Sequence, residues 1–337
     1  SCAALLALAA ACGAPPPAET PGPASQAETA VVADQGAALN AWFEEKWEEG
    51  LLRSPERLTF QGRKERYGEW DDESPAFRDE TYRLQQAAVE EMRARFDFNA
   101  LDPSAQLSWR LMRYAADEAR RARPFHDYWY EFSHFRGPHS GIPSFMINQH
   151  RVASTDDAEA YVSRLEGVRA KLGQHQANAE AQFAKGVYPP KWSYPQMIET
   201  SRNVITGAPF DGGADSVLYT DLKKKIAALD ADEATKNDLL ARGRAALINS
   251  VKPGYEGVIA MFEQQVQTAS NDDGVWKLPD GAAYYESQLR RMTTTDMTAA
   301  EIHDLGLSEV ARIHAETAGI REKGGFQGDL KAFFAYM

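Results

Sequence analysis

The amino-acid sequence predicts an all-α fold, a large multi-helix domain with few or no strands. Three observations support this prediction. From Gly36 onward, apolar residues recur at helical spacing, signals for the start and end of helices flank these stretches, and strand patterns are few and short. At 337 residues and 43% hydrophobic content, the chain is long enough to bury a large core.

The start of the chain resembles a signal for export. Residues 3–11 form an apolar run that is too short to span a bilayer, so residues 1–11 are interpreted as the remnant of a signal peptide. Three alanines stand directly before Cys12, a pattern that resembles a bacterial lipobox. We therefore expect Cys12 to carry a lipid that anchors an exported protein in a membrane, in the periplasm or at the outer membrane. A cleaved signal with Cys12 as an ordinary thiol is the alternative.

Residues 12–35 are predicted to form an extended tether that starts at the lipidated cysteine. They are rich in Pro, Ala and Ser, and their apolar residues show no period. The folded domain is then expected over 36–337. It would hold no cysteine, because Cys2 leaves with the signal and Cys12 takes the lipid. Packing, rather than disulfides, must stabilise such a domain.

Helix signals then follow in order along the domain. Ser74 before Pro75, and Asp102 before Pro103, are N-cap residues followed by a proline in the first turn, where a missing N–H costs nothing. Pro and Gly separate the later helices. The expected helices span 37–49, 74–96, 102–122, 155–185, 194–206, 215–228, 231–249, 252–270, 281–292 and 299–322.

The stretch 279–316 concentrates polar side chains that have two explanations. Thr298 and Glu301 match a capping box, so the threonines around them are explained by a turn and the start of a helix. Tyr284 and Tyr285 are candidate substrate-binding residues, because tyrosines can donate hydrogen bonds to a developing oxyanion. A tyrosine pair at the start of an amphipathic helix more often belongs to the core and its rim.

The histidines give two weaker candidates for substrate contacts. His303 and His314 share a helix face but would lie roughly 16 Å apart, too far to bind one metal, although each could line a cleft. The segment 123–150 holds four histidines, among them His139, and seven aromatic residues, without a familiar spacing of metal ligands. It is predicted to be an irregular loop over the core, or the lip of a cleft that stacks on an apolar or sugar-like ligand.

Several function classes lack support in the sequence. H-E-x-x-H, G-x-S-x-G, and the Walker and Rossmann glycine patterns are absent. The net charge of -12 argues against a nucleic-acid partner, because binding phosphates requires clustered Lys and Arg. Spacing singles out no carboxylate pair for a glycoside hydrolase.

Five segments resemble one bacterial family when taken together. They are "FRGPHSGIPSFMINQHRVASTDDAEAYVSRLEGV", "GVYPPKW", "VKPGYEGVIAMFEQQV", "GVWKLPDGAAYYESQLRRMTTTDMTAAEIHDLGLSEVARIHAE" and "GFQGDLKAFFAYM". Their order and approximate spacing are similar to those of the "domain of unknown function 885" family (DUF885). The resemblance covers about 37–337, and the segment 284–316 is its most specific part.

The resemblance implies a mostly α-helical protein, often exported or lipid-anchored, that is related to zinc-dependent peptidases of the zincin type. It also implies an H-E-x-x-P-G-H motif with a further acidic ligand in the C-terminal half. This sequence has no such stretch, so no catalytic residue or metal ligand is assigned to this chain. We expect this chain to bind no cofactor, and the full-length protein to bind zinc if it is an enzyme. Tyr284, Tyr285, His303 and His139 would then contact only a peptide substrate.

The last segment, "DLKAFFAYM", is an apolar run of helical type without a terminating residue. We therefore expect the chain to be the N-terminal part of a longer peptidase-like protein, truncated before its metal-site half and inactive alone. Leu330, Phe333, Phe334 and Tyr336 would then be exposed. The alternative is a non-enzymatic helical envelope lipoprotein that binds a ligand or partner.

Overall fold

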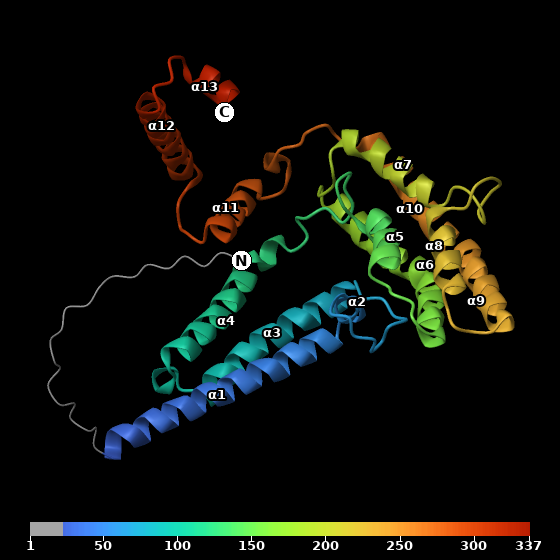
Figure 1. The fold of residues 1–337 in the computed structure, drawn as a ribbon, viewed down its shortest axis with the longest axis horizontal. Coiled ribbons are helices and arrows are strands. Elements are labelled where there is room, and N and C mark those ends of the chain that lie inside the picture. The colour runs from blue at the N-terminus through green and yellow to red at the C-terminus, as the bar shows by residue number, and fades with distance from the viewer. Residues whose placement is uncertain (1–22) are drawn as a thin grey trace.

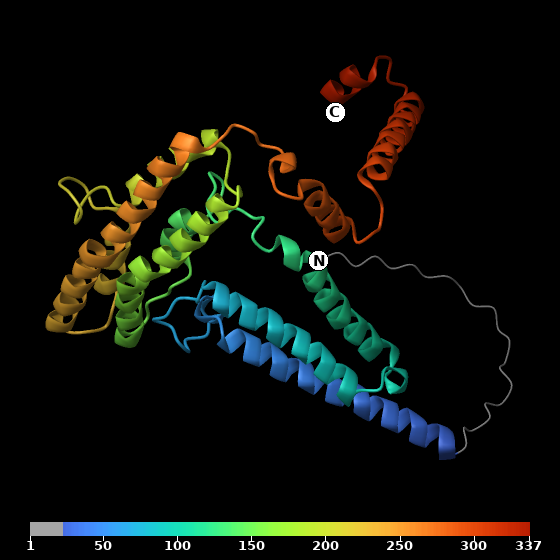
Figure 2. The ribbon, with the colours of Figure 1, turned by 180° about the vertical axis from the view of Figure 1, so that it is seen from behind.

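The computed structural model describes residues 23–337, with side chains from residue 35 onward. The predicted signal remnant and Cys12 lie outside these residues. Within 23–337, helices are the only regular elements apart from one isolated bridge between Ala208 and Asp215 (Figures 1 and 2). The prediction of an all-α fold is confirmed. None of the helices in this range combines the length and apolar character that crossing a bilayer requires.

Three long helices form the N-terminal lobe: α1 (Pro23–Leu52), α3 (Pro75–Arg95) and α4 (Pro103–Ala122). Figure 1 shows α1 and α3 running side by side, with α4 returning beside them. Trp42 is buried in their shared core, and its indole donates a hydrogen bond of 2.7 Å to Glu91 on α3. The predicted caps are present: the side chains of Ser74 and Asp102 accept hydrogen bonds from the first turns of α3 and α4.

The first helix begins earlier than expected. It starts at Pro23 rather than at residue 37, so the last part of the predicted tether, 23–35, is helical. The sequence analysis placed this segment in the tether because its apolar residues have no period. Alanine recurs through it, however, and alanine has the highest intrinsic helix propensity. A helix can therefore form there without an apolar face.

The second lobe surrounds α6 and holds the larger core. In both views of the ribbon, α6 and α10 lie beside each other at its centre (Figures 1 and 2). Twelve residues of α6 are buried, and its exposed residues recur at helical spacing on one side of the helix. The lobe consists of α5 (Pro138–Asn148), α6 (Thr155–Ala184), α7 (Tyr194–Val204), α8 (Val217–Ala227), α9 (Glu233–Ala246), the π-helical turn η4 (Leu247–Val251) and α10 (Lys252–Thr268).

One helix of this lobe was not predicted. Residues 138–148 form α5, where the sequence analysis expected an irregular loop. Gly141 and Pro143 suggested a broken segment, but Pro138 occupies the first turn and Ile142, Phe145 and Met146 are buried against the core. Tertiary packing here outweighs the low intrinsic propensity of the sequence.

Short elements connect the lobes. The segment 53–73, which includes α2 (Pro55–Phe60), leaves α1 and lies against α6. Arg164 on α6 is fully buried and donates hydrogen bonds to the backbone of this segment and to Thr59. The remaining short helices are η1 (Phe98–Ala100), η2 (Arg123–Phe125), η3 (Lys191–Ser193) and η5 (Val275–Lys277).

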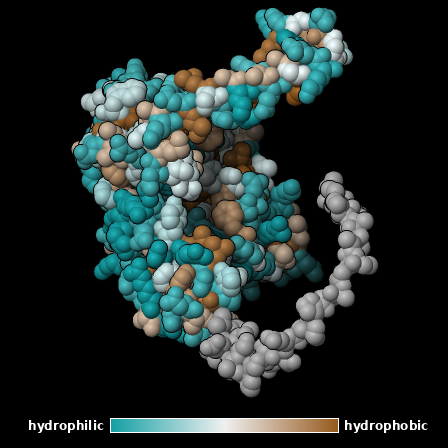
Figure 3. Space-filling model, turned by 90° about the vertical axis from the view of Figure 1, so that its left-hand side faces the viewer, coloured by the Kyte–Doolittle hydropathy of each residue, from teal (hydrophilic) through white to brown (hydrophobic). Residues whose placement is uncertain are grey.

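The chain ends in an arm of three helices: α11 (Gly281–Thr293), α12 (Ala299–Lys323) and α13 (Leu330–Tyr336). Figure 3 shows the arm projecting from the body, with apolar atoms on its surface. Of the residues of these helices, only Gly281 is buried. Of the four residues expected to be exposed, Phe334 and Tyr336 are exposed, and Leu330 and Phe333 are half-buried.

Candidate functional site

The candidate pocket lies where the segment 53–73, α5 and α6 meet. Its volume is about 280 Å³. One wall is apolar and aromatic, and the other end carries ionisable side chains. Gly137, which precedes α5, and Pro138 and Gly141 of its N-terminal half complete the lining. The apolar wall consists of Phe60, Trp70, Ile142 and Phe145, and the polar end of Glu56, Glu73, Lys171 and His175.

The aromatic wall is held in place by contacts with α6. The indole of Trp70 donates a hydrogen bond of 2.8 Å to the carbonyl of Arg164, and its ring centre lies 5.3 Å from that of Phe145. Gly167 makes room for this ring, because a Cβ there would lie 2.8 Å from Trp70. The Arg164 guanidinium covers Phe145 at 4.7 Å. The wall is therefore a built surface, with little freedom to collapse into the pocket.

Lys171 sits at the centre of the polar end. Its ammonium lies 2.7 Å from Glu56 and 2.6 Å from Glu73, and donates a hydrogen bond of 3.2 Å to the carbonyl of Asp71. Burial alone would lower the pKa of Lys171, but the charges of the two carboxylates outweigh burial and raise it. The lysine is therefore charged, and its three hydrogens all have partners.

His175 connects this cluster to a buried carboxylate. Its Nδ1 lies 2.5 Å from Glu131, which is only 3% exposed. A carboxylate can only accept a hydrogen bond, so Nδ1 carries a proton and the ring orientation is fixed. The opposite nitrogen, Nε2, lies 3.9 Å from Glu73, beyond hydrogen-bond distance. Nε2 is therefore available to a group that enters the pocket.

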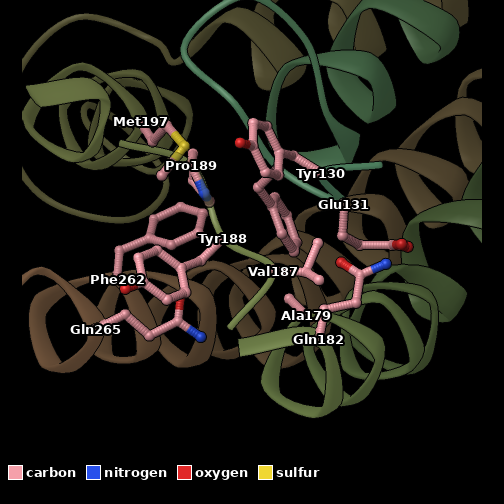
Figure 4. A pocket seen from close by; sticks show the side chains of 11 residues that line it. Tyr130, Glu131, Ala179, Gln182, Val187, Tyr188, Pro189, Met197, Phe262 and Gln265 are labelled. Carbon is pink, nitrogen blue, oxygen red and sulfur yellow. The ribbon is translucent and has the colours of Figure 1, made fainter. Parts of the chain in front are cut away.

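A second, much smaller cavity lies behind Glu131. Figure 4 shows its lining, with Glu131 and Gln182 on one side and Tyr130 above them. The Oε2 atom of Glu131 and the Nε2 atom of Gln182 are buried without hydrogen-bond partners in the described part of the chain. The cavity measures about 10 Å³, close to the size of one water molecule. The cavity has room for one water molecule beside Glu131 but is too small for a substrate.

The structure buries His139 behind the candidate pocket. The residue is 2% exposed, its ring lies between Phe132 and Phe262, and its carbonyl accepts a hydrogen bond of 2.9 Å from Tyr255. Burial lowers the pKa of His139 to about 4, so the ring is neutral at physiological pH. Two residues just before it, Gly137 and Pro138, line the pocket, while His139 does not.

The other predicted site residues lie on the C-terminal arm. Tyr284 packs against Phe125 and Tyr128, with ring centres 5.8 and 5.4 Å apart. Tyr285 is 44% exposed and lines a different cavity, of about 490 Å³, between α4, α11 and the start of α12. His303 is exposed on α12.

The four predicted residues do not form one site. Across residues 35–337, no hydrogen bond, ion pair or ring contact joins His139 to Tyr284, Tyr285 or His303. Figure 1 shows α12 in the arm at the upper left and α5 within the lobe at the right. The arm supplies no side chain to the pocket beside α6.

Sequence reasoning missed the residues that do come together, although one signal was present. Arg164, Lys171, His175, Asn178 and Gln182 recur at spacings of seven, four, three and four residues, which places them on one stripe of α6. All five are buried. A stripe of long polar side chains on a helix in the middle of a domain predicts buried polar contacts, because such side chains are rarely buried without partners.

The residues of this cluster do not fit a zinc site. No group of three or more His, Cys, Asp or Glu side chains in the described part of the chain is placed to hold a metal ion. Glu73 and His175 lie near each other, but the ammonium of Lys171 already occupies the position of a cation beside Glu73. No metal-dependent step is therefore derived from these residues.

Comparisons with known proteins support the expected family. A family model described as "Bacterial protein of unknown function (DUF885)" matches residues 55–337. Curated proteins give no match. A solved structure described as a "putative lipoprotein" of Colwellia psychrerythraea is similar with a TM-score of 0.70 at 19% identity, over 88% of this chain and 52% of its own.

A "putative lipoprotein of unknown function" from Shewanella oneidensis is similar with a TM-score of 0.55 at 18% identity, over 85% of this chain and 47% of its own. At these identities the likeness shows the fold alone. The chain spans about half the length of each of the two structures. Because the family model matches most of its residues, the chain belongs to the bacterial DUF885 family.

Proposed function

We propose that this chain is the ligand-binding part of an exported, lipid-anchored protein that acts on peptides. Two observations support export and anchoring. Two solved structures with the same fold are described as putative lipoproteins, and in this sequence an apolar run with three alanines precedes Cys12. Labelling with a palmitate analogue tests the anchor. Label is expected on the wild-type protein and lost in Cys12→Ala, and equal labelling of both would overturn the anchor.

The pocket beside α6 is the observation on which peptide binding rests. It combines an aromatic wall with ionisable groups that are held in fixed positions, as pockets for small ligands do. Its volume of about 280 Å³ is slightly below the range for pockets that hold drug-sized ligands, which begins at about 300 Å³. A single amino-acid side chain with its backbone is a ligand of suitable size and mixed polarity.

Zinc enters this proposal only through the complete protein. When bound, zinc would supply an activated water for hydrolysis. The described residues offer no such site, so the ligands would come from elsewhere in the protein. In this chain, the aromatic wall would bind the peptide side chain and exclude water from the pocket. Glu131 would hold the ring of His175 in its orientation.

The test uses the protein expressed from its complete gene. Its metal content is measured, and cleavage of a peptide library is followed with and without a chelator. Cleavage that needs metal and is lost in Gly141→Leu, which fills the pocket, supports a peptidase that uses this pocket. Peptide binding without cleavage favours the non-enzymatic envelope lipoprotein. An intact protein that neither binds nor cleaves any peptide would overturn the proposal.

A further inference from the structure

We infer that the pocket beside α6 recognises the free amino terminus of a peptide whose first side chain is apolar. This inference rests on the proposed peptide-binding function and names the class of ligand. It follows from the charges at the polar end, from the number of free acceptor atoms there, and from the aromatic wall opposite them.

The polar end carries more negative than positive charge. Two carboxylates, Glu56 and Glu73, share the single ammonium of Lys171. The lysine side chain is only 4% exposed, whereas the two glutamate side chains are 22% and 30% exposed. The cation is therefore enclosed, and the surface that faces a ligand is anionic. Such a surface attracts a cation and repels a carboxylate, including the carboxyl terminus of a peptide.

Three acceptor atoms are available around this surface. Glu56 and Glu73 each contact Lys171 through Oε1, and Oε2 of neither has a hydrogen-bond partner within residues 35–337. The third acceptor is Nε2 of His175, in the tautomer whose Nδ1 donates to Glu131. A primary ammonium has three hydrogens to donate. The number and kind of free acceptors thus match an amino terminus, whereas a blocked or tertiary amine leaves acceptors unpaired.

The opposite wall suits an apolar side chain next to that ammonium. Phe60 and Phe145 lie with ring centres 5.4 Å apart, and Trp70 lies 5.3 Å from Phe145. Aromatic faces attract a nearby cation and bury apolar groups. An apolar first residue with a free amino group satisfies both ends of the pocket, whereas a lysine side chain leaves the wall without a large apolar partner.

The experiment is a calorimetric titration of the purified chain with phenylalanine amide and with N-acetylphenylalanine amide. We expect binding of the first compound, and binding of the acetylated compound weaker by roughly tenfold to a hundredfold, since acetylation removes the charge and two of the hydrogens. Glu73→Gln is expected to weaken the binding of phenylalanine amide by a similar factor. Glu263→Gln, a matched change on the exposed face of α10, is expected to leave binding unchanged.

Gly141→Leu tests the location of the site with little risk to folding. Gly141 lines the pocket, and a Cβ there meets no atom within 4 Å, so a side chain can be added at this position without a clash. Replacing a helical glycine also favours the helix. We expect this variant to fold like the wild type, as judged by its thermal unfolding, and to lose binding of phenylalanine amide.

Two results overturn the inference. Equal binding of the free and acetylated amides would show that the amino group is not recognised. Unchanged binding in a folded Gly141→Leu would show that the ligand binds elsewhere. If neither amide binds while longer peptides are bound or cleaved, the amino-terminal specificity fails and the proposed function survives. If no peptide binds at all, the proposed function fails as well.

Discussion

Two long helices, α6 and α12, begin in the same way and end in different surroundings. Each starts with a capping box, formed by Ser154 and Asp157 in α6 and by Thr298 and Glu301 in α12. The 30 residues of α6 include twelve that are buried, whereas none of the 25 residues of α12 is buried. Local signals are therefore sufficient to start a helix. Burial in the tertiary structure determines which of its polar side chains are held in fixed positions by buried partners.

The largest expected effect distinguishes two arginines on these helices. Arg164→Met removes a buried cation that donates to Thr59, His150 and the backbone of residues 55 and 69, and it leaves those acceptors unpaired. We expect a loss of several kcal/mol in the free energy of unfolding, because each buried acceptor left unpaired costs about 1–3 kcal/mol. The matched variant Arg312→Met, on exposed α12, should leave the urea midpoint unchanged. Equal midpoints for both variants would contradict the account.

A second prediction concerns two histidines of the α6 lobe. Burial lowers the pKa of His139 to about 4 and that of His150 to about 3, against an ordinary value of 6.5. Below pH 6.5 these histidines bind protons in the unfolded chain but not in the folded protein. The contribution of the neutral histidines to the free energy of unfolding is therefore fully present above pH 6.5, and it is lost as the pH falls towards the folded-state pKa values. Each of the two histidines should lower the free energy of unfolding at pH 5 by about 2 kcal/mol relative to pH 7.

Urea unfolding at the two pH values measures this loss. His139→Gln should remove about half of the loss, and His303→Gln on exposed α12 is the matched control. A pH dependence that His139→Gln leaves intact would show that the buried imidazole is not its source.

The two capping boxes should respond differently to the same change. Ser154→Ala and Thr298→Ala each remove a cap that is worth about 1 kcal/mol. For Ser154→Ala we expect the whole loss in the global free energy of unfolding, because α6 is the centre of the larger core. For Thr298→Ala we expect faster amide hydrogen exchange within α12 and an unchanged midpoint. A global loss in both variants would mean that α12 unfolds together with the core.

The smallest expected effect comes from two helical glycines in open positions. A Cβ at Gly141 in α5, or at Gly306 in α12, meets no atom within 4 Å. Alanine at a helical position is favoured over glycine by about 0.5–1 kcal/mol. Gly141→Ala should raise the urea midpoint, and Gly306→Ala should slow hydrogen exchange only in α12. A lower midpoint for Gly141→Ala would show that α5 needs the glycine.

The sequence predicted the elements better than the site. Helix caps at Ser74, Asp102 and Thr298 were predictable because they depend on neighbouring residues. Helix α5 was not, because Gly141 and Pro143 lower its propensity and only packing against other helices stabilises it.

The candidate pocket depends on contacts between residues that lie far apart in the chain. Glu73 and Lys171 are 98 positions apart, and no local pattern pairs them. The polar stripe of α6 indicated buried partners without identifying them. The stretch around His303 attracted attention because it is rich in polar side chains, yet its helix is exposed. Burial, which distinguishes the two helices, follows from tertiary structure.

Hydrogen–deuterium exchange with and without phenylalanine amide locates the ligand site, because it reports on both regions at once. We expect slower exchange in residues 53–73 and in α5, which line the pocket, and unchanged exchange in α12. Protection confined to α11 and α12, or no protection in any segment at saturating ligand, would contradict the assignment of the ligand site to the pocket beside α6.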